Sequence, residues 1–130
     1  MKEHILVVDD EPQIRELLSI YLAKQGYRVS TTSTTEDTMQ LVGQEPVDLV
    51  VLDIGLAEED GLSLLVRLKS DHPALLVIML TGMGFVEDLL QEAYQKGADG
   101  YVSKVLPLDE LLMTIQRTLN PAIKAAEVRC

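Results

Sequence analysis

Aromatic and basic residues are both scarce in this sequence. Its 130 residues include four Tyr, one Phe and no Trp, and only eleven Lys and Arg against twenty-one Asp and Glu. Proteins that hold single-stranded nucleic acids commonly stack the bases on aromatic rings. A net charge of −10 also repels a phosphate backbone, although it favours solubility as well. We therefore expect no direct nucleic-acid binding by this segment.

Cysteine and long apolar runs are scarce as well. The single cysteine, Cys130, excludes a disulfide within the chain and any CxxC metal site. The first apolar run, 5–8, is too short for a signal peptide or a membrane span. These features fit a cytoplasmic protein that does not enter a membrane.

The remaining composition is that of a globular domain. Apolar residues make up 47% of the chain and charged residues 25%. A chain of 130 residues can bury a substantial core and suggests one domain. We expect this domain to occupy residues 3–120, with 121–130 as a C-terminal tail or the start of a linker.

Short apolar runs alternate with amphipathic stretches along the whole domain. The expected strands are 5–8, 27–32, 47–53, 75–80 and 100–103. The expected helices are 12–25, 61–70, 85–96 and 108–119. A further helix is expected to begin at a capping box of Ser33 and Glu36 and to end near Gly43. Such alternation predicts an α/β fold with a doubly wound parallel sheet and helices on both faces.

Polar residues follow four of these strands. Asp9 and Asp10 come after the first, Asp53 ends the third, Thr81 follows the fourth and Lys104 the fifth. Taken singly, Asp9, Asp10 or Thr81 could cap the next helix, and Lys104 could be a solvated surface residue. The carboxyl ends of parallel strands meet at one edge of the sheet, where ligands bind in such folds. Together these residues therefore predict a site.

The residue types point to phosphoryl chemistry. Three carboxylates in one place repel each other unless one takes up a proton or a cation lies among them. Oxygen ligands with room for water suit Mg²⁺, and Lys104 adds a further positive charge. Phosphoryl transfer depends mainly on positioning and charge neutralisation. Asp53 is the candidate nucleophile, because a carboxylate can form an aspartyl-phosphate, and Thr81 could donate a hydrogen bond to a phosphoryl oxygen.

At these positions the chain resembles a bacterial response-regulator receiver domain of two-component systems. The similar segments are VVDDEP at 7–12, VVLDIGLAEEDGL at 50–62, IMLTG at 78–82 and GADGYVSK at 97–104. The resemblance covers about residues 3–120. It implies a flavodoxin-like fold with five helices and a five-stranded sheet of order 2-1-3-4-5.

The resemblance also implies a role for each residue of the site. Asp53 accepts a phosphoryl group from a partner histidine kinase, and Thr81 and Lys104 contact that group. The implied ligands of Mg²⁺ are Asp9, Asp10, Asp53 and the backbone carbonyl of Gly55. The domain then acts as a signalling switch and not as an enzyme, since it catalyses only its own phosphorylation and dephosphorylation.

The switch in such domains involves Thr81, which moves toward the phosphoryl group, and an aromatic residue, here Tyr101, which turns inward. Tyr101 could equally be an ordinary core residue. The surface formed by 85–96, 100–103 and 108–119 then changes shape to control an output domain or a downstream protein, and it could also support a homodimer.

Two positions depart from the family's usual pattern. Val105 follows Lys104 at a position where these domains commonly have a proline joined by a cis peptide bond. A cis bond before a residue other than proline costs about 3–4 kcal/mol. We therefore expect a trans bond between Lys104 and Val105 and a shifted loop after it. Ala57 also replaces a common proline. In such domains the residues two positions after the acceptor and two after the threonine can orient the attacking water. Here they are Gly55 and Met83, whose side chains cannot do so, and we therefore expect a long-lived phosphoryl group.

Other functions fit the residues less well. A phosphatase with an aspartyl nucleophile usually has a second acid two residues later, where this chain has Gly55. A flavodoxin-like cofactor binder needs a loop rich in Ser, Thr or Gly after the first strand, and the loop here is acidic. TGMGFVE at 81–87 lacks the third glycine of a dinucleotide-binding loop. A receiver that binds proteins without phosphorylation remains an alternative because of Val105.

Overall fold

Strands and helices alternate along the chain. The computed structural model describes residues 3–56, 60–82, 87–104 and 108–120. The strands are β1 (His4–Val8), β2 (Arg28–Thr32), β3 (Leu49–Asp53), β4 (Leu76–Thr81) and β5 (Gly100–Ser103). The helices are α1 (Pro12–Lys24), α2 (Thr35–Gln44), α3 (Gly61–Asp71), α4 (Glu87–Gln95) and α5 (Leu108–Leu119).

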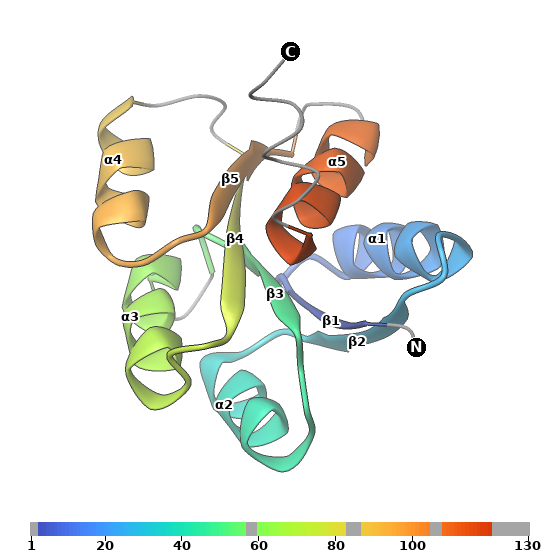
Figure 1. Cartoon of the computed structure of the whole chain (residues 1–130), viewed down its shortest axis with the longest axis horizontal. Helices are drawn as coiled ribbons and strands as arrows, with labels where there is room; N and C mark the ends of the chain where they lie inside the picture. The colour runs from blue at the N-terminus through green and yellow to red at the C-terminus, as the bar shows by residue number, and fades with distance from the viewer. Residues whose placement is uncertain (1–2, 57–59, 83–86, 105–107, 121–130) are drawn as a thin grey trace.

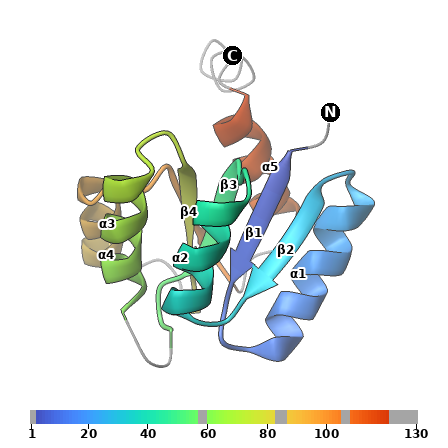
Figure 2. The same cartoon turned by 90° about the horizontal axis from the view of Figure 1, so that it is seen from below.

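The five strands form one parallel sheet in the order β2-β1-β3-β4-β5, which confirms the expected topology (Figures 1 and 2). The apolar runs become the inner strands, because β1, β3 and β4 lie between helices on both faces. All residues of β1 and β3 are buried, whereas β2, at an edge of the sheet, is only partly covered. The core therefore lies on both sides of the central strands.

Helices α1 and α5 cover one face of the sheet, and α2, α3 and α4 cover the other (Figure 1). Successive strand residues point to opposite faces, so each strand contributes to two cores. The core under α1 and α5 is formed largely by Ile5, Val7, Leu49, Val51, Ile78, Leu22 and Ile115. The core under α2, α3 and α4 contains Leu6, Val50, Leu52, Met79, Leu64, Leu65 and Leu68.

The predicted capping box at Ser33 is wrong by one residue. Thr34 is the N-cap of α2, and its side chain accepts a hydrogen bond from the backbone N–H of Asp37 at 3.1 Å. The hydroxyl of Thr32, at the end of β2, lies 2.7 Å from that of Thr38, which joins the strand to the first turn of the helix. Helix α2 therefore begins after Thr34 and not after Ser33. The first two residues of the helix predicted over 85–96 lie outside the described residues.

The carboxyl ends of β1, β3, β4 and β5 lie at one edge of the sheet, as the register of the parallel ladders requires. At this edge the backbone at the start of α3 lies close to the backbone at the end of β3. A Cβ atom added at Gly61, the first residue of α3, would lie only 2.3 Å from the backbone oxygen of Asp53, so α3 begins directly against the end of β3. Within the ranges that the structure describes, no helix has the length and apolar character needed to cross a membrane.

Candidate functional site

A cluster of carboxylates lies at this edge of the sheet. Asp9, Asp10, Glu11 and Asp53 each place one carboxylate oxygen within 4.8 Å of the others. Asp9 is fully buried and Asp53 is 3% exposed, whereas Asp10 is partly buried and Glu11 is exposed. The cluster is therefore open to solvent on the side of Glu11 and closed by the sheet on the other.

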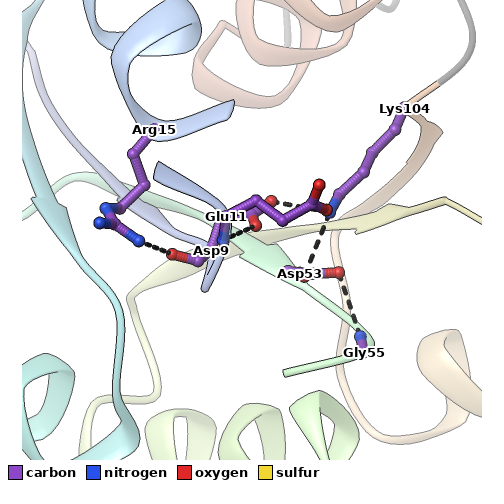
Figure 3. A network of polar contacts seen from close by, with 6 residues as sticks. All are labelled: Asp9, Glu11, Arg15, Asp53, Gly55 and Lys104. Atoms are coloured by element: carbon purple, nitrogen blue, oxygen red, sulfur yellow. Dashed lines mark hydrogen bonds and ion pairs between the residues drawn. The ribbon is translucent and has the colours of Figure 1, made fainter. Parts of the chain in front are cut away.

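Asp9 is held by contacts on both its side chain and its backbone (Figure 3). Its Oδ1 accepts a hydrogen bond from the N–H of Glu11 at 2.9 Å, which bends the chain at the end of β1. Its carbonyl oxygen accepts a hydrogen bond from Nη1 of Arg15 on α1 at 2.7 Å. Its Oδ2 is left to face the centre of the cluster.

The two carboxylate oxygens of Asp53 have different partners. Oδ1 accepts a hydrogen bond from the N–H of Gly55 at 3.1 Å, because the chain turns sharply after β3. Oδ2 lies 3.2 Å from Nζ of Lys104. The carboxylate is thus fixed in orientation, with one oxygen directed at the lysine.

Lys104 brings its ammonium into contact with three carboxylates. Nζ lies 2.9 Å from Oδ2 of Asp9, 2.9 Å from Oε1 of Glu11 and 3.2 Å from Oδ2 of Asp53 (Figure 3). The backbone N–H of Lys104 donates to the carbonyl of Thr81 at 2.7 Å, which ties the end of β5 to the end of β4. Lys104 is therefore the shared counter-ion of the cluster.

Burial and charge shift the pKa values of two of these groups. Burial raises the pKa of Asp53, and the charge of Asp9 adds to this effect; the hydrogen bond from Gly55 and the charge of Lys104 oppose it. Burial by itself lowers the pKa of Lys104, but its hydrogen bonds to Asp9 and Glu11, together with the charges of Asp53 and Asp9, raise it overall. Lys104 is therefore a permanent cation in this site.

The donor set suits a divalent cation. Four carboxylates outnumber the ammonium of Lys104 and the guanidinium of Arg15, so the cluster retains excess negative charge. Carboxylate oxygens are the ligands that Mg²⁺ and Ca²⁺ prefer, and the solvent-facing side leaves room for water ligands. Such an acidic cluster is typical of the divalent metal site of receiver domains.

The structure brings together most of the residues that the sequence predicted for the site. Asp9, Asp10, Asp53 and Lys104 meet at the sheet edge. Thr81 is fully buried at the end of β4 and is connected to Lys104 through its carbonyl. The backbone N–H of Gly55 contacts Asp53, and the role of its carbonyl as a metal ligand stays a prediction.

Tyr101 lies apart from the carboxylates. It is 8% exposed and belongs to the core under α2, α3 and α4, and its role in the switch stays a prediction. Ala57 and Val105, which depart from the family pattern, and Met83 lie outside the described residues. The expectations about them stay predictions.

Two residues of the site were missed by the sequence reading. Glu11 contacts Lys104, and Arg15 supports the backbone of Asp9. Glu11 directly follows the acidic pair 9–10, and Arg15 lies one helical turn beyond Glu11 on α1. The acidic pair was therefore the sequence feature that could have drawn attention to both residues. Neither contact could be inferred, because each depends on where the side chain points in the folded protein.

Comparison with known proteins agrees with this geometry. Residues 5–116 match the family model described as response regulator receiver domain. The probable transcriptional regulator ycf27 of Guillardia theta is 40% identical over 127 residues, which cover 96% of this chain and 48% of that protein. The chain spans only 28–54% of the length of the curated relatives that it matches.

Solved structures show the same fold. A CheY-like response regulator receiver domain protein from Methanospirillum hungatei JF-1 has a TM-score of 0.87 and 27% identity, over 96% of this chain and 99% of that one. A response regulator protein from Burkholderia pseudomallei has a TM-score of 0.82 and 26% identity, over 97% of this chain and 73% of that one. The latter structure contains a phosphorylated aspartic acid, a calcium ion and citrate.

Proposed function

Since this chain belongs to the response regulator receiver domain family, we propose that it accepts a phosphoryl group on Asp53 and thereby switches a signalling surface. A receiver domain is a signalling module with a phosphorylatable aspartate, and it is not a conventional enzyme. The observation that carries the assignment to Asp53 is its position. It is a buried carboxylate with one oxygen held by Gly55 and the other directed at Lys104.

The transfer itself requires little covalent chemistry from the protein. A carboxylate oxygen of Asp53 attacks the phosphorus of the donor as the bond from phosphorus to the leaving group breaks, a P–N bond in phosphohistidine and a P–O bond in acetyl phosphate. With a phosphohistidine donor, the leaving imidazole takes up a proton. We propose a histidine kinase as the partner that supplies the phosphoryl group, and Lys104 would compensate the charge of the phosphoryl oxygens.

A divalent cation, which we propose to be Mg²⁺, would neutralise the charge that accumulates during this transfer. The residues that would hold it are Asp9, Asp10, Asp53 and the backbone carbonyl of Gly55. The carboxylate geometry supports this set, because each of the three aspartates contributes an oxygen to the cluster, in which Glu11 is the fourth carboxylate. Arg15 would keep Asp9 in place through its carbonyl.

Phosphorylation would reach the surface through β4 and β5. Thr81 would bind a phosphoryl oxygen through its hydroxyl. Thr81 pairs with Ser103 in the parallel ladder, and Met79 pairs with Tyr101, so a shift at the end of β4 acts directly on β5. We propose that Thr81 and Tyr101 couple the site to the face formed by α4, β5 and α5. That face would control an output domain or a downstream protein, or form a homodimer.

The test is intact mass after incubation with acetyl phosphate and Mg²⁺. We expect a phosphoryl-sized mass increase in the parent protein that requires Mg²⁺ and is absent from Asp53→Asn. The matched control is Asp71→Asn, which removes an exposed aspartate from the C-terminal end of α3. An adduct that persists in Asp53→Asn would show that another residue is the acceptor.

A partner kinase provides the second arm of this test. If acetyl phosphate leaves the parent unmodified, a phosphorylated histidine kinase supplied in the same buffer should still transfer its phosphoryl group to it. Failure with both donors would exclude the proposed switch and favour a receiver that binds its partner without phosphorylation.

A further inference from the structure

Glu11 contacts Lys104 but has no role in the proposed phosphoryl transfer. Its Oε1 lies 2.9 Å from Nζ, as close as the buried Oδ2 of Asp9. Asp9 and Asp53 would have roles as cation ligand and phosphoryl acceptor. Glu11 belongs to neither of these proposed roles, so its contact with the lysine requires its own explanation.

Capping of helix α1 does not explain the orientation of the Glu11 side chain. It occupies the N-cap position, yet its side chain makes no capping hydrogen bond. Ser, Thr, Asp and Asn are the residues that satisfy free N–H groups at this position. Its side chain is 56% exposed and lies toward Lys104 (Figure 3). Among the residues that the structure describes, Lys104 is therefore the partner of the Glu11 side chain.

The hydrogen-bonding capacity of Lys104 makes this contact consequential. An ammonium group has three N–H donors. Oxygens of three carboxylates lie within 3.2 Å of Nζ, and Oε1 of Glu11 accepts a hydrogen bond from it at 2.9 Å. A phosphoryl oxygen that arrives at Asp53 must therefore compete with these carboxylates, and with the hydrogen bond to Glu11 in particular, for the ammonium of Lys104.

The three carboxylates differ in how they would respond to phosphorylation. A cation would take over the charge of Asp9, and Asp53 loses its own charge when it forms the acyl phosphate. Glu11 would remain charged and within contact distance of Nζ after the transfer. It is the partner that continues to compete for the lysine after the transfer.

We infer that Glu11 is a positioning residue that competes with the phosphoryl group for the ammonium of Lys104 and thereby slows capture of the phosphoryl group by Asp53. This inference rests on the proposed function. It has two consequences: neutralising Glu11 accelerates phosphorylation, and the acceleration requires Lys104.

The test compares Glu11→Gln with the parent in two measurements. Phosphorylation by phosphoramidate with Mg²⁺ is followed by intact mass, and the affinity for beryllofluoride, which imitates the phosphoryl group without any transfer, is measured by NMR titration of backbone amides. We expect Glu11→Gln to react about two- to fivefold faster and to bind beryllofluoride tighter by a similar factor, as for the loss of a partly exposed ion pair. The amide spectrum also reports whether the variant is folded.

Two controls separate this role from a general charge effect. Glu16→Gln removes the same charge from an exposed position on α1 and should leave both measurements unchanged. In a Lys104→Met background, Glu11→Gln should produce no gain, and sampling by mass spectrometry over hours would follow a slower reaction.

Each other outcome overturns the inference. A Glu11→Gln variant that equals the parent would show that the contact does not restrain Lys104. A gain that persists in Lys104→Met, or that Glu16→Gln reproduces, would show that only net charge matters. If the parent takes up neither a phosphoryl group nor beryllofluoride, the proposed function itself fails and this inference falls with it.

Discussion

The ammonium of Lys69 and the carboxylate of Asp99 form an ion pair of 2.7 Å at the end of the sheet opposite the acidic cluster. Oδ2 of Asp99 also accepts the N–H of Val77 at 2.9 Å, and Nζ of Lys69 also donates to the carbonyl of Leu75 at 2.7 Å. These contacts join α3, the start of β4 and the chain that enters β5. They fasten the end of β5 that lies away from Lys104.

Removing Asp99 should therefore destabilise the fold. Asp99→Ala leaves the N–H of Val77 and the ammonium of Lys69 without their shared acceptor, and we expect a loss of about 1–3 kcal/mol in the free energy of unfolding. Urea denaturation measures this loss. In a double-mutant cycle with Lys69→Met, the two substitutions should not be additive. Additive effects would show that the ion pair contributes nothing of its own.

Gly61 should not tolerate a side chain. The Cβ atom of alanine would lie 2.3 Å from the backbone oxygen of Asp53 and 2.8 Å from Cα of Ile54, and backbone atoms cannot easily move away. We expect Gly61→Ala to lower the free energy of unfolding by about 1–3 kcal/mol and to slow phosphorylation, because it displaces the end of β3.

Gly43 provides the matched control for this substitution. It lies inside α2, and a Cβ atom there would meet nothing within 4 Å. Gly43→Ala should stabilise the protein by about 0.5–1 kcal/mol, since alanine favours the helix. Equal effects of the two substitutions on urea denaturation would contradict the close approach at Gly61.

Asp53 should reduce stability at neutral pH in the absence of a divalent cation. Burial, aided by the charge of Asp9, raises its pKa in the folded protein, so the native state binds this proton more readily than the unfolded chain does. Asp53→Asn resembles the protonated form and should raise the free energy of unfolding at pH 7. The gain should shrink as pH falls through the raised pKa and vanish below the ordinary value of 3.8. Denaturation with a chelator present, at several pH values, measures it; a gain independent of pH would contradict the assignment.

Mg²⁺ should stabilise the folded protein, because a ligand that binds only the native state shifts the unfolding equilibrium. At about 100 times the dissociation constant the gain is roughly 2.7 kcal/mol. Thermal unfolding should show a higher Tm with Mg²⁺ than with Na⁺ at equal ionic strength. Asp9→Asn should lose most of this shift, whereas Asp37→Asn, at an exposed position on α2, should keep it. An equal shift in both variants would place the cation elsewhere.

The fold and the core of the site could be predicted from the sequence because both depend on position along a strand. The apolar runs predicted buried parallel strands, and the residue after each run had to lie at the same edge of the sheet. Asp9, Asp53, Thr81 and Lys104 were found in this way, and the structure places all four at the ends of β1, β3, β4 and β5. Local patterns were weaker at boundaries, as the shift of the N-cap from Ser33 to Thr34 shows.

The sequence by itself therefore determined the element order and the acids that gather at the sheet edge, since strand periodicity and strand ends are local properties of the chain. Only the tertiary structure decided which side chains from distant parts of the chain form ion pairs and hydrogen bonds with each other. Glu11 reaches Lys104 across 93 positions, and Lys69 reaches Asp99 across 30. Such pairs depend on the directions of long side chains from different elements, and these directions exist only once the helices pack against the sheet.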